Sequence, residues 1–93
     1  MLDEIATDIR KALQTKSFVG SLKFDCGADG VIVLADGTAD TTDRETDCTL
    51  RLSADNLVSL IKGKLNPMMA LATGKIKLSG NPAVAMNLAK LLG

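Results

Sequence analysis

The sequence predicts a single α+β domain, and three observations support this fold class. The first fourteen residues have the apolar spacing of an amphipathic helix. Between residues 18 and 52, short alternating or apolar segments are separated by Asp-Gly pairs, which is typical of strands joined by turns. From residue 53 onward, a serine and two Asn-Pro pairs mark helix starts. The 93 residues suit one domain covering 1–93, and we find no linker or internal repeat.

The N-terminal helix is predicted over residues 2–14. Leu2, Ile5, Ile9 and Leu13 fall on one face at helical spacing, so this face should meet the core. Acidic residues come early in the segment and basic residues late, which is the order that the helix dipole favours.

Four strand segments follow. Residues 18–26 alternate between the two sides of a strand, and residues 31–35 are all apolar, which suits a strand covered on both faces. A turn at Asp36-Gly37 should lead into a short edge strand near Thr38, and the acidic segment 39–47 should be an exposed loop. Residues 48–52 alternate again.

The C-terminal half is predicted to be three helices and one strand. Ser53 is a suitable N-cap for a helix that ends at Gly63. Asn66-Pro67 should begin a short helix that Gly74 closes, and Asn81-Pro82 should begin the last one. Between them, residues 75–78 alternate between charged and apolar and are predicted to form a strand.

The charge is zero overall but unevenly distributed along the chain. Residues 1–47 carry ten acidic and five basic groups, whereas residues 48–93 carry one acidic and six basic groups. This asymmetry suggests a dipolar surface, and a zero net charge gives no reason to expect nucleic-acid binding.

The sequence lacks histidine and shows no recognisable catalytic motif. Without histidine there can be no Ser-His or Cys-His nucleophile pair. Cys26 and Cys48 fall on the apolar sides of predicted strands, where buried and inert thiols are expected. The carboxylates of 36–47 lack calcium-loop spacing, and the glycines match no nucleotide-binding motif. We therefore predict no catalytic residues, no metal site and no cofactor.

The sequence also bears on the compartment. The acidic N-terminus lacks the apolar run of a signal peptide, and no apolar stretch approaches the length of a membrane span. Two cysteines do not form a disulfide framework. The expectation is a soluble, cytoplasmic protein with reduced thiols.

The most informative feature is a surplus of apolar side chains in the last third of the chain. Apolar positions of the final helix span roughly 220° of its circumference, and the segment 67–72 has no polar side chain after its cap. The sequence has only two aromatic residues, so any apolar cavity would be lined mainly by Leu, Met and Ala and would have adjustable walls. Either both helices are simply well buried, or a ligand, a second subunit or a membrane covers the surplus.

From about residue 46 the pattern becomes specific to a family. The segment Asp47–Ser53 leads into the helix, Gly63–Pro67 follows, and then come Met68–Asn81 and Ala85–Leu88. This pattern resembles the sterol carrier protein type 2 domain family, which is also called the sterol-binding or sterol-transfer domain. The signature covers about half of the chain, and the N-terminal half fits more loosely.

The resemblance implies a five-stranded, mostly antiparallel sheet covered by helices, with an apolar tunnel between them. It also implies non-catalytic binding of fatty acids, fatty acyl-CoA, phospholipids or sterols, and their transfer between membranes. By motif position, the tunnel lining is predicted to comprise Leu57, Ile61, Leu65, Met68, Met69, Leu71, Ala72, Val84, Met86 and Leu88.

Two further expectations concern partners. Lys62, Lys64, Lys75 and Lys77 surround the signature segment with no acidic residue nearby, which suggests contact with lipid head groups or a transient contact with an anionic membrane. Alternatively, these lysines simply form an ordinary solvated face. A monomer is favoured, but a homodimeric or partner-binding module, or an accessory domain that presents lipid to a separate enzyme, stays open.

Overall fold

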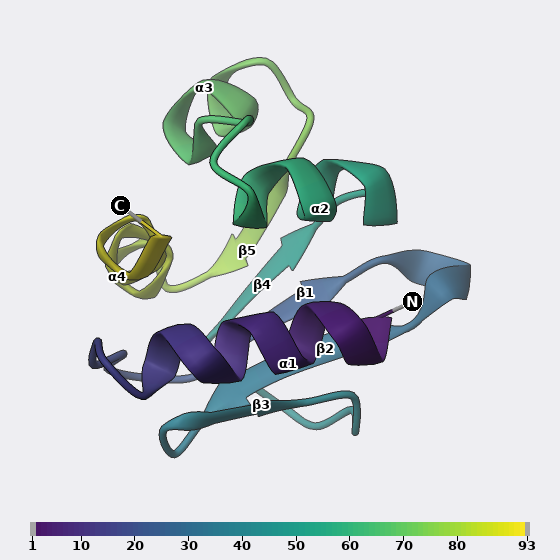
Figure 1. The fold of residues 1–93 in the computed structure, drawn as a ribbon. Coiled ribbons are helices and arrows are strands. Elements are labelled where there is room, and N and C mark those ends of the chain that lie inside the picture. Colours follow the sequence, from purple (N-terminus) through teal and green to yellow (C-terminus); the bar gives the residue numbers. More distant parts are fainter. Residues whose placement is uncertain (1, 93) are drawn as a thin grey trace.

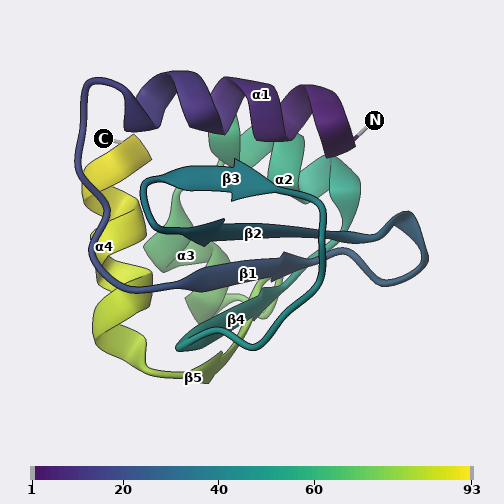
Figure 2. The same cartoon turned by 90° about the horizontal axis from the view of Figure 1, so that it is seen from below.

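The computed structural model describes residues 2–92, and in it four helices lie against one face of a five-stranded sheet (Figures 1 and 2). The helices are α1 (Leu2–Leu13), α2 (Ala54–Ile61), α3 (Pro67–Ala72) and α4 (Pro82–Leu92). The strands are β1 (Leu22–Asp25), β2 (Val31–Ala35), β3 (Thr38–Asp40), β4 (Cys48–Arg51) and β5 (Lys77–Gly80), with a 3₁₀ turn at Gly27–Asp29. The predicted α+β class is confirmed.

The strand order is β3-β2-β1-β4-β5, and three of the four pairings are antiparallel. The central pair, β1 with β4, is parallel, with Leu22 opposite Cys48 and Phe24 opposite Leu50. A parallel pair needs a long connection, and here β2, β3 and the segment 41–47 supply it. The sheet is therefore mostly antiparallel, as expected.

One continuous apolar core fills the space between the sheet and the helices. Alternate residues of the central strands enter it, with Leu22 and Phe24 from β1 and Ile32 and Leu34 from β2, each fully buried. The helices contribute the apolar faces that their spacing predicted, including Ile9 of α1. Because successive side chains of a strand point to opposite faces of the sheet, one side of each alternating segment packs against the helices.

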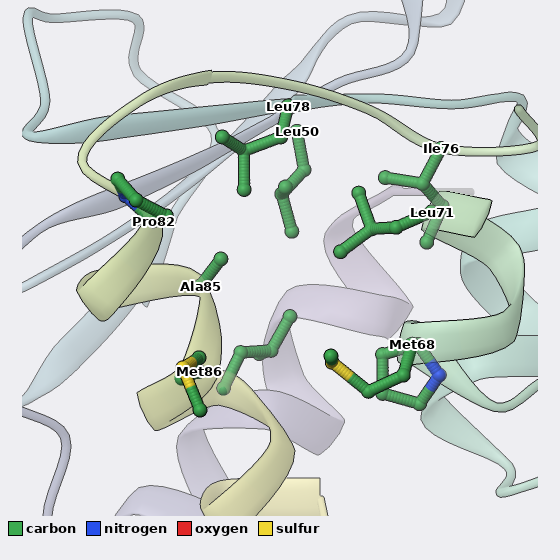
Figure 3. A pocket seen from close by; sticks show the side chains of 10 residues that line it. Leu50, Met68, Leu71, Ile76, Leu78, Pro82, Ala85 and Met86 are labelled. Atoms are coloured by element: carbon green, nitrogen blue, oxygen red, sulfur yellow. The ribbon is translucent and has the colours of Figure 1, made fainter.

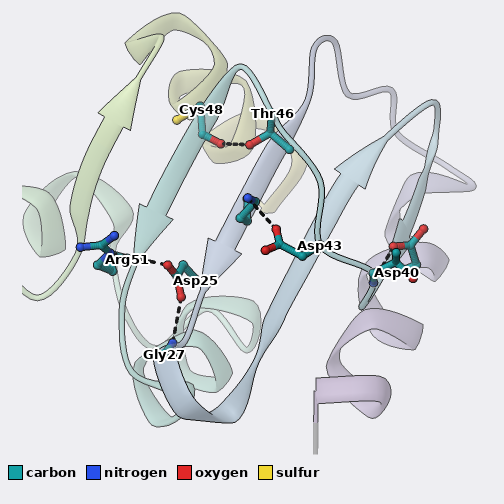
Figure 4. Close-up of polar contacts among 9 residues, drawn as sticks. Asp25, Gly27, Asp40, Asp43, Thr46, Cys48 and Arg51 are labelled. Carbon is teal, nitrogen blue, oxygen red and sulfur yellow. Dashed lines mark hydrogen bonds and ion pairs between the residues drawn. The ribbon is translucent and has the colours of Figure 1, made fainter.

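The other face of the sheet is partly covered by the segment 41–47, which runs across it (Figures 2 and 4). Lys23 of β1 pairs with Asp43 of this segment at 2.6 Å. Val33 of β2 is buried although it lies outside the main core. The expectation that residues 31–35 are covered on both faces is confirmed for the middle of that strand.

Two predicted strands differ from the structure, each for a local reason. The strand predicted from residue 18 begins only at Leu22, because the left-handed backbone at Gly20 interrupts the extended segment. The strand predicted at 75–78 is instead β5 at Lys77–Gly80. The amides of Lys75 and Ile76 both donate to the carbonyl of Ala70, so these residues finish the turn after α3.

The predicted caps of α2 and α3 are confirmed. The Ser53 hydroxyl accepts the amide of Asn56 at 3.1 Å, and the Asn66 side chain accepts the amides of Met68 and Met69. Among residues 2–92, no helix has the length and apolar character needed to cross a bilayer.

Candidate functional site

An apolar cavity of about 170 Å³ lies between α3, α4 and the β4–β5 half of the sheet (Figure 3). Met68 of α3 and Met86 of α4 stand on opposite sides of it, and both side chains are more than half exposed, so they mark its mouth. All of its lining residues are apolar, namely Leu50, Pro67, Met68, Leu71, Ile76, Leu78, Pro82, Ala85, Met86 and Leu88. Such a lining can hold apolar groups but offers no acid, base or nucleophile.

The wall formed by α4 is fixed by backbone geometry at its start. The amide of Asn81 donates to the carbonyl of Asp47 at 2.9 Å, and the Asn81 side chain accepts the amide of Ala83. Gly80 comes just before, at φ +95°, and a Cβ there would collide with the Asp47 carbonyl oxygen. These contacts tie α4 to β4, and Ala85 and Leu88 of this helix pack into the core.

The opposite wall, α3, is held much more loosely. Ala70 is the one buried residue of this six-residue helix, and the others are half-buried or exposed. The helix is maintained by its own ends, since Asn66 caps the first turn and the Thr73 hydroxyl donates to the carbonyl of Met69 at 2.9 Å. A short element with little buried apolar surface opens at low cost, so α3 is the wall most able to move.

The structure brings four of the ten predicted lining residues to this cavity: Met68, Leu71, Met86 and Leu88. The others lie elsewhere. Leu57 and Val84 are buried in the core, Leu65 packs against it, and Ile61 borders a second groove. Met69 and Ala72 are exposed on α3.

Six lining residues were not predicted, and they come from the sheet, from the turn before β5 and from the first turns of α3 and α4. Leu50 and Leu78 of the sheet form the floor, and Ile76 precedes β5. The alternation of 48–52 put Leu50 on an apolar side, but nothing in the sequence says which sheet face meets α3 and α4. Pro67, Pro82 and Ala85 were recognised only as helix residues.

The four predicted lysines do not converge, and none of them lines the cavity. Lys64 and Lys75 are exposed in the loops before and after α3. Lys62 borders an open groove of about 390 Å³ between α1, α2 and α4, together with Asp8 and Lys16. Lys77 lies beside Arg51, its partner in the β4–β5 ladder, at a polar depression on the sheet.

Both cysteines are free and buried, so their thiols are poor nucleophiles. Burial, followed by the charges of Asp29 and Asp25, raises the pKa of Cys26 to about 11. Burial also raises the pKa of Cys48. Within residues 2–92, no group of His, Cys, Asp or Glu side chains is placed to hold a metal ion.

Comparison with known proteins agrees with this geometry. The model of the SCP-2 sterol transfer family matches residues 2–93. The chain belongs to this family. Its relatives include sterol carrier protein 2 of Gallus gallus, which is 42% identical over 50 residues. The match covers 54% of this chain and only 9% of that protein, so the chain spans a small part of its relative's length.

A second relative is hydroxysteroid dehydrogenase-like protein 2 of Bos taurus, which is 42% identical over 48 residues. The match covers 52% of this chain and 12% of that protein.

Solved SCP-2 structures share the whole fold. Sterol carrier protein 2 from Aedes aegypti, in complex with the C16 fatty acid palmitate, has a TM-score of 0.79 at 20% identity and covers 98% of this chain and 93% of its own. Sterol carrier protein 2 like 2 from the same organism has a TM-score of 0.77 at 21% identity, covering 96% and 94%.

Proposed function

We propose that this domain binds one lipid acyl chain, without catalysis, in the cavity between α3 and α4. The wholly apolar lining with exposed methionines at its mouth is the observation that carries the proposal. The lack of a nearby acid-base pair favours carriage over chemistry, and the palmitate complex of the Aedes relative supports an acyl ligand. The proposed contacts are Met68, Leu71, Met86 and Leu88 together with the six unpredicted residues named above.

The size of the cavity favours a flexible chain over a rigid ring system. An apolar cavity of about 150 Å³ can hold one benzene molecule, so a cavity of about 170 Å³ accommodates roughly six carbon atoms. A sixteen-carbon chain therefore requires α3 to move away from α4. A flexible chain can enter a few carbon atoms at a time as α3 moves, whereas a rigid fused-ring molecule needs a cavity as wide as its ring system from the start. Each methylene removed from water contributes about 0.8 kcal/mol towards that movement.

We further propose that the domain works as a monomer. Its two free thiols favour a reducing compartment such as the cytoplasm.

A second candidate role is that of an accessory domain presenting lipid to a separate enzyme. It is supported by the small share that this segment forms of its longer relatives, one of them a dehydrogenase-like protein. Adding the loaded domain to such an enzyme should then raise its rate beyond that seen with free lipid.

Native mass spectrometry tests the proposal of one acyl chain per cavity. Delipidated domain mixed with palmitate is expected to gain the mass of one fatty acid and to remain a monomer, because one cavity with one loose wall accepts one chain. Cholesterol under the same conditions is expected to give much weaker uptake. A tight dimer that takes up no lipid would instead favour the partner-binding module.

A further inference from the structure

We propose that the domain docks on anionic membranes by the rim of its cavity, with α3 and the exposed side of α4 facing the lipid. Among the described residues, four large apolar side chains are more than half exposed, and three of them lie on these two helices: Met68, Met69 and Met86. We call these three residues the methionine rim. Their exposed fractions are 56%, 62% and 60%. Methionine is flexible and polarizable, so it can pack into disordered acyl chains without a fixed geometry.

The charge around the methionine rim complements an anionic surface. Residues 56–93 contain five lysines and not one aspartate or glutamate. Lys64 and Lys75 stand in the two loops that flank α3, and both are exposed. None of the ion pairs found among residues 2–92 involves these two lysines. Exposed lysines near a membrane surface each add about 1 kcal/mol of attraction to anionic lipid.

Most of the acidic residues belong to elements away from α3. Every carboxylate side chain belongs to residues 1–55, and most are carried by α1, by β3 and by the segment 41–47 that follows it. Figure 1 shows α1 and β3 at the end away from α3. The resulting dipole would turn the cavity mouth towards a negative surface and the acidic end away from it.

The composition of this face fits lipid better than protein. Protein interfaces are enriched in aromatic residues, methionine and arginine and depleted in lysine. After Arg51 the chain has no arginine and no aromatic residue, and the only charged side chains beyond Asp55 are lysines. A face made of methionine, small apolar residues and lysine has the chemistry of a membrane-surface contact.

The reason for docking rests on the proposed function, but membrane binding can be measured independently of lipid uptake. If the rim meets the bilayer, the mouth between Met68 and Met86 opens directly onto lipid, and an acyl chain can pass without crossing water. The exposed α3 would be the element that shifts as the chain enters.

Co-sedimentation with vesicles that contain about one third phosphatidylserine, at low salt, tests the docking face. The double variant Lys64→Gln/Lys75→Gln is expected to bind more than tenfold more weakly. Met69→Ser is expected to bind severalfold more weakly while its palmitate uptake stays unchanged, because Met69 does not line the cavity. Vesicles of phosphatidylcholine alone should retain little of any variant.

Matched controls separate the rim from general surface properties. Lys11→Gln/Lys16→Gln removes the same charge from α1 and the turn that follows it, and Val19→Ser removes an exposed apolar side chain that is not on α3 or α4. Both controls should bind vesicles like the parent domain. Equal losses in rim and control variants, or no binding to anionic vesicles, would overturn the docking proposal. The proposed lipid function fails separately, if delipidated domain in solution takes up no palmitate.

Discussion

Saturating palmitate is expected to raise the melting temperature of the delipidated domain by roughly 10–20 °C. A ligand that binds only the folded state stabilises it by about 2.7 kcal/mol at a concentration 100 times its dissociation constant. In a domain of this size, each kcal/mol shifts the melting temperature by about 4–8 °C. The measurement is a thermal scan monitored by circular dichroism, with ligand kept below its micelle concentration.

Filling the cavity should remove this stabilisation. Ala85 faces the cavity from α4, and Ala85→Phe would place a ring in the space that the acyl chain needs. The matched control is Ala72→Phe, which adds the same ring on the exposed side of α3. Palmitate should shift the control as it shifts the parent and should leave Ala85→Phe within about 2 °C of its own unliganded value. Equal shifts in both variants would mean that the chain binds somewhere else.

Gly80→Ala is expected to destabilise the domain by about 3 kcal/mol and to lower its melting temperature by roughly 12–24 °C. The backbone at Gly80 has φ +95°, which is unfavourable for any residue with a Cβ, and the added methyl would meet the Asp47 carbonyl oxygen and lie 3.1 Å from the Cα of Cys48. Both neighbours are backbone atoms, at the residue before β4 and at its first residue, and they cannot rotate away. Because Gly80 precedes α4, the substitution should also disturb the cavity wall.

Gly74→Ala separates the steric contribution from the conformational one. Gly74 also has a positive φ, +79°, but a Cβ there would meet nothing within 4 Å. The expected cost is about 1 kcal/mol, which lowers the melting temperature by roughly 4–8 °C. Chemical and thermal unfolding of both variants give the comparison. Equal tolerance at the two positions would contradict the close approach of Gly80 to the backbone of Asp47 and Cys48.

Locally determined features could be predicted from the sequence. The caps at Ser53 and Asn66 and the start of α4 at Pro82 depend on side chains within a few residues, so the pattern located these helices to within one or two residues. The amphipathic spacing of the first segment identified α1 and its buried face for the same reason. The sheet composition and the tunnel were expected from the family resemblance rather than from periodicity.

Features that depend on how the folded chain is arranged could not be predicted. Lys75 and Ile76 alternate like a strand, but their amides bond back to Ala70, and only the folded chain shows this. The neighbouring sequence does not indicate that Leu50 and Leu78 form the cavity floor, or that Leu57 is buried in the core instead. Sequence proximity also suggested that four lysines form one group, whereas the fold places Lys77 next to Arg51 and Lys62 beside α1.

Methyl NMR of the methionines is the most direct test of the claim that the acyl chain lies between α3 and α4. Met68 and Met86 line the cavity, whereas Met69 is on the same short helix as Met68 but outside the lining. In protein carrying ¹³C-methyl methionine, palmitate should shift the Met68 and Met86 signals and give Overhauser contacts from both methyls to the acyl chain, with little change at Met69. Palmitate that binds without contacts to either Met68 or Met86 would contradict the account.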